Sequence, residues 1–266
     1  MGIITQDITC AGNMPAFVAM PDAKGQLFAC VILLHERYGL VQHTKDLAMR
    51  FAREGYVCVA PDLFFMHPDQ DALHRGDAGC EPTDDAVAAQ MDAAIDAALT
   101  RFSADPARLA VMGVCQTARY PIVCASRRKI AAALCWYGAA QPREWAQTAR
   151  FPVPLEDLIA KADCPVLGMF GEKDHIISVD DVRKFRSALE AHKKSYEIEI
   201  FIDAPHGWLN DTMPGRYRPQ QAQAAWQAQQ AFLHRAMAPN KSDVIIQKFT
   251  AAIGQAYDFS KHVRYE

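Results

Sequence analysis

The sequence predicts an α/β fold with a mainly parallel central sheet and helices on both faces. Short apolar runs rich in β-branched residues alternate with longer segments of helical periodicity, which is the pattern of repeated β–α units. The apolar runs are hydrophobic throughout rather than alternating with polar residues, as is typical of strands buried on both faces. Half of the residues are hydrophobic and 22% are charged, which suits a globular chain that covers both faces of a sheet.

The strands are predicted from these apolar runs and from the turn residues that bound them. They span residues 29–35, 56–61, 108–113, 131–138, 165–171 and 196–202. Two weaker runs, ITQDI and FVAM near the N-terminus, are expected to form an antiparallel pair at the start of the sheet.

Four helices are predicted between or after the strands, at residues 44–55, 84–102, 178–192 and 219–237. The first ends at Gly55, and the second opens with acidic residues in its first turn. Ser178 is the expected N-cap of the third, and Pro219 opens the fourth in a favoured early position.

Two segments lie outside this pattern. Residues 62–83 are long for a connection and are expected to lie over the functional site as a loop or cap. Residues 1–238 are expected to form one α/β domain, and residues 239–266 a helical extension that packs on it or on a partner. The apolar face of that extension comprises Val244, Ile245, Phe249, Ala252 and Ile253.

Composition argues against several classes of function. The formal net charge is −3 and the basic residues are scattered, so nucleic-acid binding is not expected. The N-terminus lacks a signal-peptide pattern, and no apolar run reaches the roughly 20 residues of a membrane span, so a cytoplasmic protein is expected. The eight cysteines form no C-x-x-C pair, which favours free thiols and predicts no metal site and no cofactor.

Cys115 is the candidate nucleophile. The strand ending at residue 113 runs into GVCQTA and then into a helical segment, so Cys115 lies at an abrupt strand-to-helix turn. Such a turn projects the side chain above the sheet, and amides at the start of a helix stabilise a thiolate. The competing interpretation is a buried thiol that follows a core strand.

An acid and a base follow further along the chain, each after a predicted strand. Asp174 is the candidate acid, with Glu172 in the same loop, and His206 is the candidate base, with His175 as a weaker competitor. Open α/β sheets build their sites at the carboxyl ends of strands. The order nucleophile, acid, histidine is that of α/β-hydrolases, so an α/β-hydrolase fold is predicted.

The first strong strand ends at His35-Glu36-Arg37, where α/β-hydrolases place an oxyanion loop. The backbone amides of Arg37 and Gln116 are therefore the expected oxyanion hole. Glu36 is either a solvent-facing loop charge or, if it lies close to Cys115, a group that modifies the thiol.

Six segments together resemble the dienelactone hydrolase family, whose members are α/β-hydrolases that open lactones with a Cys-Asp-His triad. They are LLHERYGL, EGYVCVAPDLF, GVCQTAR, WYG, PVLGMFGEKDHIIS and DAPHGWLND. The resemblance implies that Cys115 is the nucleophile, His206 the base and Asp174 its partner. It also implies that Glu36 holds the thiol until substrate arrives.

The chain departs from the family at three positions. Thr117 and Ala118 replace glycines after the nucleophile, which crowds the turn, and Asn210 replaces an arginine that grips the substrate carboxylate in the family. Arg75, Arg216 and Arg218 are candidate replacements in neighbouring loops. The residues expected to bind substrate are Tyr38, Tyr137, Trp208, Arg75 and Asn210.

The sequence therefore predicts a carboxymethylenebutenolidase-like hydrolase, monomeric or homodimeric, that cleaves an ester or lactone through a cysteine-bound acyl-enzyme. Two other functions stay open. One is a small-molecule binding protein whose altered turn has lost its chemistry, and the other is a redox protein that uses Cys115 and Cys124.

Overall fold

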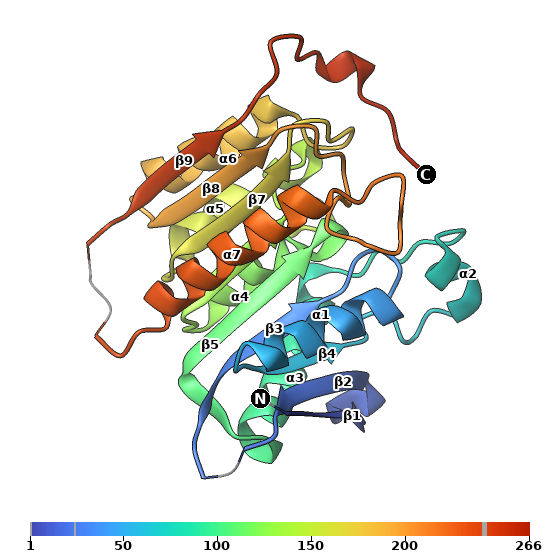
Figure 1. Ribbon diagram of the computed structural model, residues 1–266, viewed down its shortest axis with the longest axis vertical. Coiled ribbons are helices and arrows are strands. Elements are labelled where there is room, and N and C mark those ends of the chain that lie inside the picture. Colours follow the sequence, from blue (N-terminus) through green and yellow to red (C-terminus); the bar gives the residue numbers. More distant parts are fainter. Residues whose placement is uncertain (1, 24, 241–243) are drawn as a thin grey trace.

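The structure is a computed structural model that describes residues 2–23, 25–240 and 244–266. These residues form a nine-stranded sheet in the order β1-β2-β4-β3-β5-β6-β7-β8-β9 (Figure 1). The β1–β2 and β2–β4 pairs are antiparallel, and all other neighbouring strands are parallel. The mainly parallel α/β sheet and the antiparallel pair at its start are therefore confirmed.

All of the predicted strands form. The strands are β1 Ile3–Thr9, β2 Pro15–Pro21, β3 Phe28–Leu34, β4 Val57–Pro61, β5 Ala104–Val114, β6 Ala132–Trp136, β7 Val166–Gly171, β8 Tyr196–Phe201 and β9 Gln247–Ala251. β5 begins earlier than predicted because Ala104 pairs with Phe28 before the register shifts between Phe28 and Cys30.

Helices cover both faces of the sheet. They are α1 Gln42–Arg53, α2 Gln70–Arg75, α3 Asp84–Arg101, α4 Tyr120–Arg127, α5 Leu155–Lys161, α6 Val179–Ala191 and α7 Pro219–Ala236, with short 3-10 helices η1 Ala11–Asn13, η2 Cys115–Thr117, η3 Pro142–Trp145 and η4 Phe259–Lys261. The buried side chains of α1 and α7 pack on one face, and those of α3 to α6 pack on the other (Figure 1). Ser178 caps α6 as predicted, because its hydroxyl accepts from Asp181 N–H at 3.1 Å.

The predicted C-terminal helix is wrong. Residues 247–251 form β9, which pairs in parallel with β8 through the register Tyr196↔Gln247 to Ile200↔Ala251. The outer edge of β8 offers unpaired backbone groups, and pairing with them outweighs the weak helical pattern. Of the expected apolar face, Val244 and Ile245 are exposed, whereas Phe249 packs partly against the core.

The segment 62–83 contains the short helix α2, whose N-cap Asp69 accepts from Ala72 N–H at 2.9 Å. Within the described parts of the chain, no helix has the length and apolar character needed to cross a bilayer.

Candidate active site

Cys115 lies directly after β5 in a left-handed backbone conformation, with φ of 58°. Such a conformation is strained for a residue other than glycine and is frequent at functional turns. Two glycines make room for it. A Cβ on Gly113 would overlap the carbonyl of Thr117, and a Cβ on Gly138 would overlap the carbonyl of Cys115. The backbone around the thiol is therefore tightly packed.

Thr117 holds this turn closed with its buried hydroxyl. The hydroxyl oxygen accepts from Val114 N–H at 3.0 Å and lies 2.8 Å from the carbonyl of His35, to which it donates. Ala118 is also fully buried and faces Gly138. The crowding expected where the family has glycines is thus accommodated, and Thr117 links β5 to the loop that follows β3.

A hydrogen-bonded row joins Cys115, His206 and Asp174. His206 Nε2 lies 3.0 Å from Cys115 Sγ, and His206 Nδ1 lies 2.8 Å from Asp174 Oδ2. Asp174 Oδ1 accepts from the backbone of Ile176 at 2.7 Å and of Ile177 at 3.1 Å, which orients the carboxylate. The row therefore fixes both ring nitrogens of His206 between a thiol and a carboxylate.

The surroundings of His206 favour its charged form. Burial lowers the pKa of the ring, but the charges of Asp174 and Cys115 and their hydrogen bonds outweigh burial and raise it well above its ordinary value. The ring is 4% exposed, so these interactions are only weakly screened.

The two competing residues take other roles. The His175 ring lies 5.8 Å from the His206 ring, and its Nδ1 is buried without a hydrogen-bond partner among the described residues. Burial, followed by the charge of His206, lowers the pKa of His175. Glu172 accepts from the backbone N–H of Asp203 at 3.0 Å and of Gly254 at 2.8 Å, so it joins loops.

Glu36 is buried and bonded on both oxygens. Tyr137 Oη donates to Oε1 at 2.9 Å, and Asn210 Nδ2 donates to Oε2 at 2.6 Å. Burial, followed by the charges of Glu36 and Cys115, raises the pKa of Tyr137 well above its usual range, which keeps this hydroxyl a donor. Within the described residues Glu36 makes no hydrogen bond to Cys115, and the thiol pairs with His206 instead.

His35, for which the sequence pattern suggests no role, connects two parts of the site. Its Nδ1–H donates to the carbonyl of Glu36 at 2.6 Å, and its Nε2 accepts from Leu63 N–H at 3.0 Å. Asp62 lies 3.7 Å from Nε2, but burial lowers the pKa of His35, and an Nε2 that accepts from an amide carries no proton. His35 is therefore a neutral link between the Glu36 loop and the segment 62–83.

The side chains of both expected oxyanion residues bond the segment 62–83. Arg37 Nη2 donates to the carbonyls of Gly76 and Ala78, each at 3.2 Å, and Gln116 Nε2 donates to the carbonyl of Cys80 at 2.5 Å. The backbone N–H of Arg37 has no hydrogen-bond acceptor within the described residues.

The expected substrate-binding residues lie in different environments. Tyr137 and Asn210 lie at the site but bond Glu36, and Trp208 is fully buried against Trp136, with ring centroids 5.4 Å apart. Arg75 does not reach the site, because its side chain is 63% exposed and pairs with Asp77 at 2.9 Å. Arg75 is the last residue of α2, and its side chain points toward solvent. The direction of this side chain cannot be predicted from the sequence.

Tyr38 is buried and bonded to Arg216, whose Nη1 donates to the tyrosine hydroxyl at 3.2 Å. Arg216 Nε donates to the carbonyl of Tyr265 at 2.6 Å. The guanidinium belongs to a residue that is only 6% exposed, yet no carboxylate of the described residues pairs with it. A buried cation with only neutral partners is costly and marks a candidate anion-binding position.

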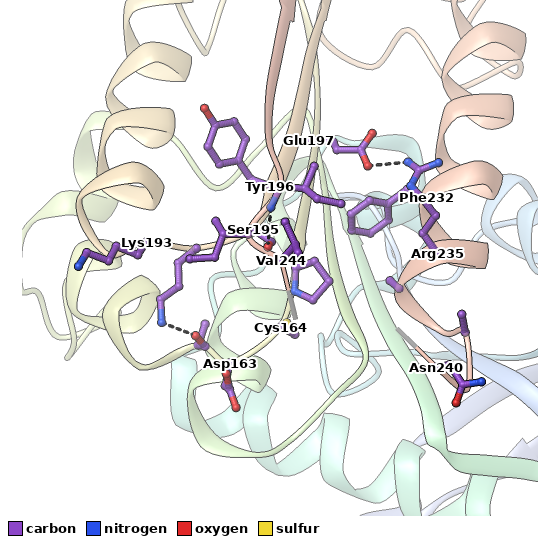
Figure 2. Close-up of a pocket in the computed structure, with 17 residues that line it drawn as sticks. Asp163, Cys164, Lys193, Ser195, Tyr196, Glu197, Phe232, Arg235, Asn240 and Val244 are labelled. Carbon is purple, nitrogen blue, oxygen red and sulfur yellow. Dashed lines mark hydrogen bonds and ion pairs between the residues drawn. The ribbon is translucent and has the colours of Figure 1, made fainter. Parts of the chain in front are cut away.

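Figure 2 shows a surface pocket of about 510 Å³, whose lining residues include no member of this row. It is lined by residues at the amino-terminal ends of β7 and β8 and by the end of α7, including Pro165, Ser195 and Phe232. Within it Arg235 and Glu197 form an ion pair with each other at 2.5 Å. Because the row brings a thiol within hydrogen-bond distance of a histidine that a carboxylate orients, we locate the candidate active site at Cys115 and not at this pocket.

Among the residues that the structure describes, no three histidine, cysteine or acidic side chains lie close enough together to hold a metal ion.

Comparison with known proteins matches residues 14–237 to the dienelactone hydrolase family. A Salmonella typhimurium protein provisionally named carboxymethylenebutenolidase is 32% identical over 222 residues, which is 81% of this chain and 80% of that protein. A Bradyrhizobium protein provisionally named 2-oxo-3-(5-oxofuran-2-ylidene)propanoate lactonase is 28% identical and covers 79% of this chain and 85% of its own length. A crystal structure from Klebsiella pneumoniae, provisionally named dienelactone hydrolase, superposes with a TM-score of 0.78 at 28% identity, covering 88% of this chain and 100% of that one.

Proposed function

Since the chain belongs to the dienelactone hydrolase family, we propose that it hydrolyses an ester or lactone through a thioester formed on Cys115. The observation that carries the proposal is the row Cys115–His206–Asp174, in which a thiol lies within hydrogen-bond reach of a base that is itself oriented by a carboxylate.

The first half of the reaction forms the acyl-enzyme. The thiolate of Cys115 attacks the carbonyl carbon, the C–O bond to the leaving group breaks, and protonated His206 donates its Nε2 proton to the departing oxygen. In a lactone the leaving hydroxyl stays attached to the acyl group. Asp174 orients His206 and stabilises its charged form.

The second half releases the acid. His206 takes a proton from a water molecule that attacks the thioester, and the C–S bond breaks to regenerate the thiol. In both halves the negative charge on the carbonyl oxygen is stabilised by the backbone amides of Arg37 and Gln116. The bonds from the side chains of these two residues to the segment 76–80 hold their backbones in place.

The proposal is tested by turnover of a panel of aryl esters and small lactones. Cys115→Ala is expected to abolish turnover, and His206→Ala to lower kcat by on the order of a hundredfold or more. Cys124→Ala is the matched control, because Cys124 is a buried thiol on α4 outside the row. Full turnover by Cys115→Ala would contradict the proposal.

The substrate is further proposed to carry an anionic group, which Arg216 binds. Its buried guanidinium has neutral partners only, and its Cδ lies 3.3 Å from the position of a Cβ on Gly207, next to the base. The test compares a carboxylate-bearing ester with its neutral methyl ester. Arg216→Gln is expected to lower kcat/KM for the charged ester by roughly 10- to 100-fold more than for the neutral one.

Arg75→Gln is the comparison for this test, since Arg75 is exposed and paired with Asp77. The ratio of the two kcat/KM values is expected to stay unchanged in that variant. If the ratio of kcat/KM for the charged ester to that for the neutral ester is unchanged in Arg216→Gln, the proposed anion site is contradicted.

The redox alternative receives no support from the geometry. Cys124 is 3% exposed, and burial raises its pKa to about 12, which disfavours the thiolate that disulfide exchange needs.

A further inference from the structure

The C-terminal segment returns to the end of the sheet that carries the candidate active site. β9 runs parallel to β8, so the chain leaves β9 at the carboxyl end of β8, where the loop with His206 also begins (Figure 1). Ala252 N–H continues the pairing by donating to the carbonyl of Ile200 at 3.0 Å. The matched family region ends at residue 237, before this segment.

The segment 252–266, here called the tail, makes three hydrogen bonds to the loop that carries Asp174 and to the first residue of α6. Gly254 N–H donates to Glu172 Oε1 at 2.8 Å, and Tyr257 Oη accepts from Val179 N–H at 2.9 Å. Between these two contacts, His262 Nδ1 lies 3.0 Å from the backbone carbonyl of Asp174 and donates to it. The tail therefore forms hydrogen bonds to residues on both sides of Asp174 and to Asp174 itself.

His262 is itself held in a fixed orientation. Its ring packs edge-on against Tyr257 at 5.2 Å and Phe259 at 5.5 Å. The carboxylate of Asp174 is bonded by backbone amides and by His206, so the bond from His262 restrains the remaining oxygen of that residue. This restraint fixes the direction of the Asp174 peptide group.

The tail also reaches the loop that carries His206. The carbonyl of Tyr265 accepts from Arg216, and the carbonyl of Glu266 lies against Gly215, where it would overlap a Cβ. The tail thus bonds both loops whose side chains meet in the Cys115–His206–Asp174 row.

We propose that the tail is an added part of the active site, in which His262 is a positioning residue that holds the Asp174 loop against His206. This role rests on the proposed function of the row. Small displacements of an orienting group lower the rate of the chemical step more than they weaken substrate binding.

The test removes the donor and keeps the ring. His262→Phe preserves the packing with Tyr257 and Phe259 but cannot donate, whereas His262→Asn restores a donor near the position of Nδ1. We expect His262→Phe to lower kcat about tenfold with little change in KM, and His262→Asn to recover most of the loss. Lys261→Ala is the control, since its side chain is 78% exposed and pairs only with Asp258.

Wild-type kcat in His262→Phe, or an equal loss in His262→Asn, would overturn the positioning role. The melting temperature of each variant is measured as well. A large decrease in His262→Phe would show that this variant has lost folded structure and not only the hydrogen bond to Asp174.

A substrate-free measurement separates this inference from the proposed function. Alkylation of Cys115 by iodoacetamide reports its thiolate, which is stabilised by the charged form of His206 beside it. A weaker Asp174–His206 bond makes that charged form less stable, so His262→Phe is expected to slow the alkylation of Cys115. If no ester or lactone is turned over but alkylation is slowed, the proposed function fails and the positioning role survives; an alkylation rate equal to wild type contradicts the role.

Discussion

The hydrogen bonds of Thr117 stabilise the turn at Cys115. Cys115 adopts its left-handed conformation next to a fully buried threonine, and the hydroxyl of that threonine is bonded to both Val114 and His35. The residue that crowds the turn also stabilises it, and it links the strand before Cys115 to the loop that contains Glu36.

Replacing Thr117 tests this role. Thr117→Val keeps the shape but leaves a buried amide of Val114 and a buried carbonyl of His35 without the hydroxyl, so we expect a loss of about 2–3 kcal/mol in the free energy of unfolding. Thr117→Ser retains the hydroxyl and is expected to lose about 1 kcal/mol or less. Urea denaturation measures both values, and equal stabilities of the two variants would contradict the assigned hydrogen bonds.

The candidate residues of the row were predictable because each follows a strand of a parallel sheet. The carboxyl ends of such strands meet at one edge, which brings the neighbourhoods of Cys115, Asp174 and His206 together. The partners of Glu36 and the contact of His262 were not predictable, because they depend on side-chain directions and on where the tail runs. For the same reason the sequence offered Arg75 as readily as Arg216.

At the scale of elements, a buried ion cluster joins α3, the start of α4 and η3. Arg119 bonds Asp84 at 2.9 Å, and Glu144 lies 3.9 Å from the same guanidinium with one oxygen unbonded. Burial raises the pKa of Glu144 to about 7, and Arg119 only partly offsets that effect. The folded protein therefore holds a proton on Glu144 at pH values where the unfolded chain has released it.

This proton makes stability depend on pH. The contribution of protonated Glu144 to the free energy of unfolding is fully present below about pH 4.5 and is lost as the pH rises through about 7. At about 1.4 kcal/mol per pKa unit, the loss amounts to about 3 kcal/mol at most. Glu144→Gln is expected to remove this part of the pH dependence when unfolding free energies are compared at pH 5 and pH 8. The exposed residue Glu54 provides the control Glu54→Gln; a pH dependence equal to wild type in Glu144→Gln would contradict the assignment.

Most elements were predictable from periodicity, whereas the C-terminal strand was not. Amphipathic segments and uniformly apolar runs carry a strong local signal, as in α1 and β7. β9 carries a weak local signal, and its structure is decided by the open edge of β8, which lies some fifty residues earlier in the chain. Non-local pairing of this kind overrides local propensity.

For the whole molecule, the C-terminal segment completes both the sheet and the site. Phe249, Ile253 and Tyr257 pack partly against the main core, and β9 covers the edge of β8. Truncation after Ala238 is therefore expected to lower the free energy of unfolding by about 3 kcal/mol and to reduce turnover. Ile245→Ser, at a half-exposed position, is expected to change stability by about 0.5 kcal/mol or less. A truncated protein with wild-type stability and turnover would show that the segment is dispensable.

We propose that the whole fold serves to present Cys115 as a nucleophile that carries the acyl group. Intact-protein and peptide mass spectrometry during turnover of an activated aryl ester tests it most directly. We expect a mass increase equal to one acyl group, located on Cys115, that accumulates in His206→Asn and is absent in Cys115→Ala. Turnover by the wild-type protein with no adduct detected in it or in His206→Asn, or an acyl group located on another residue, would contradict this proposal.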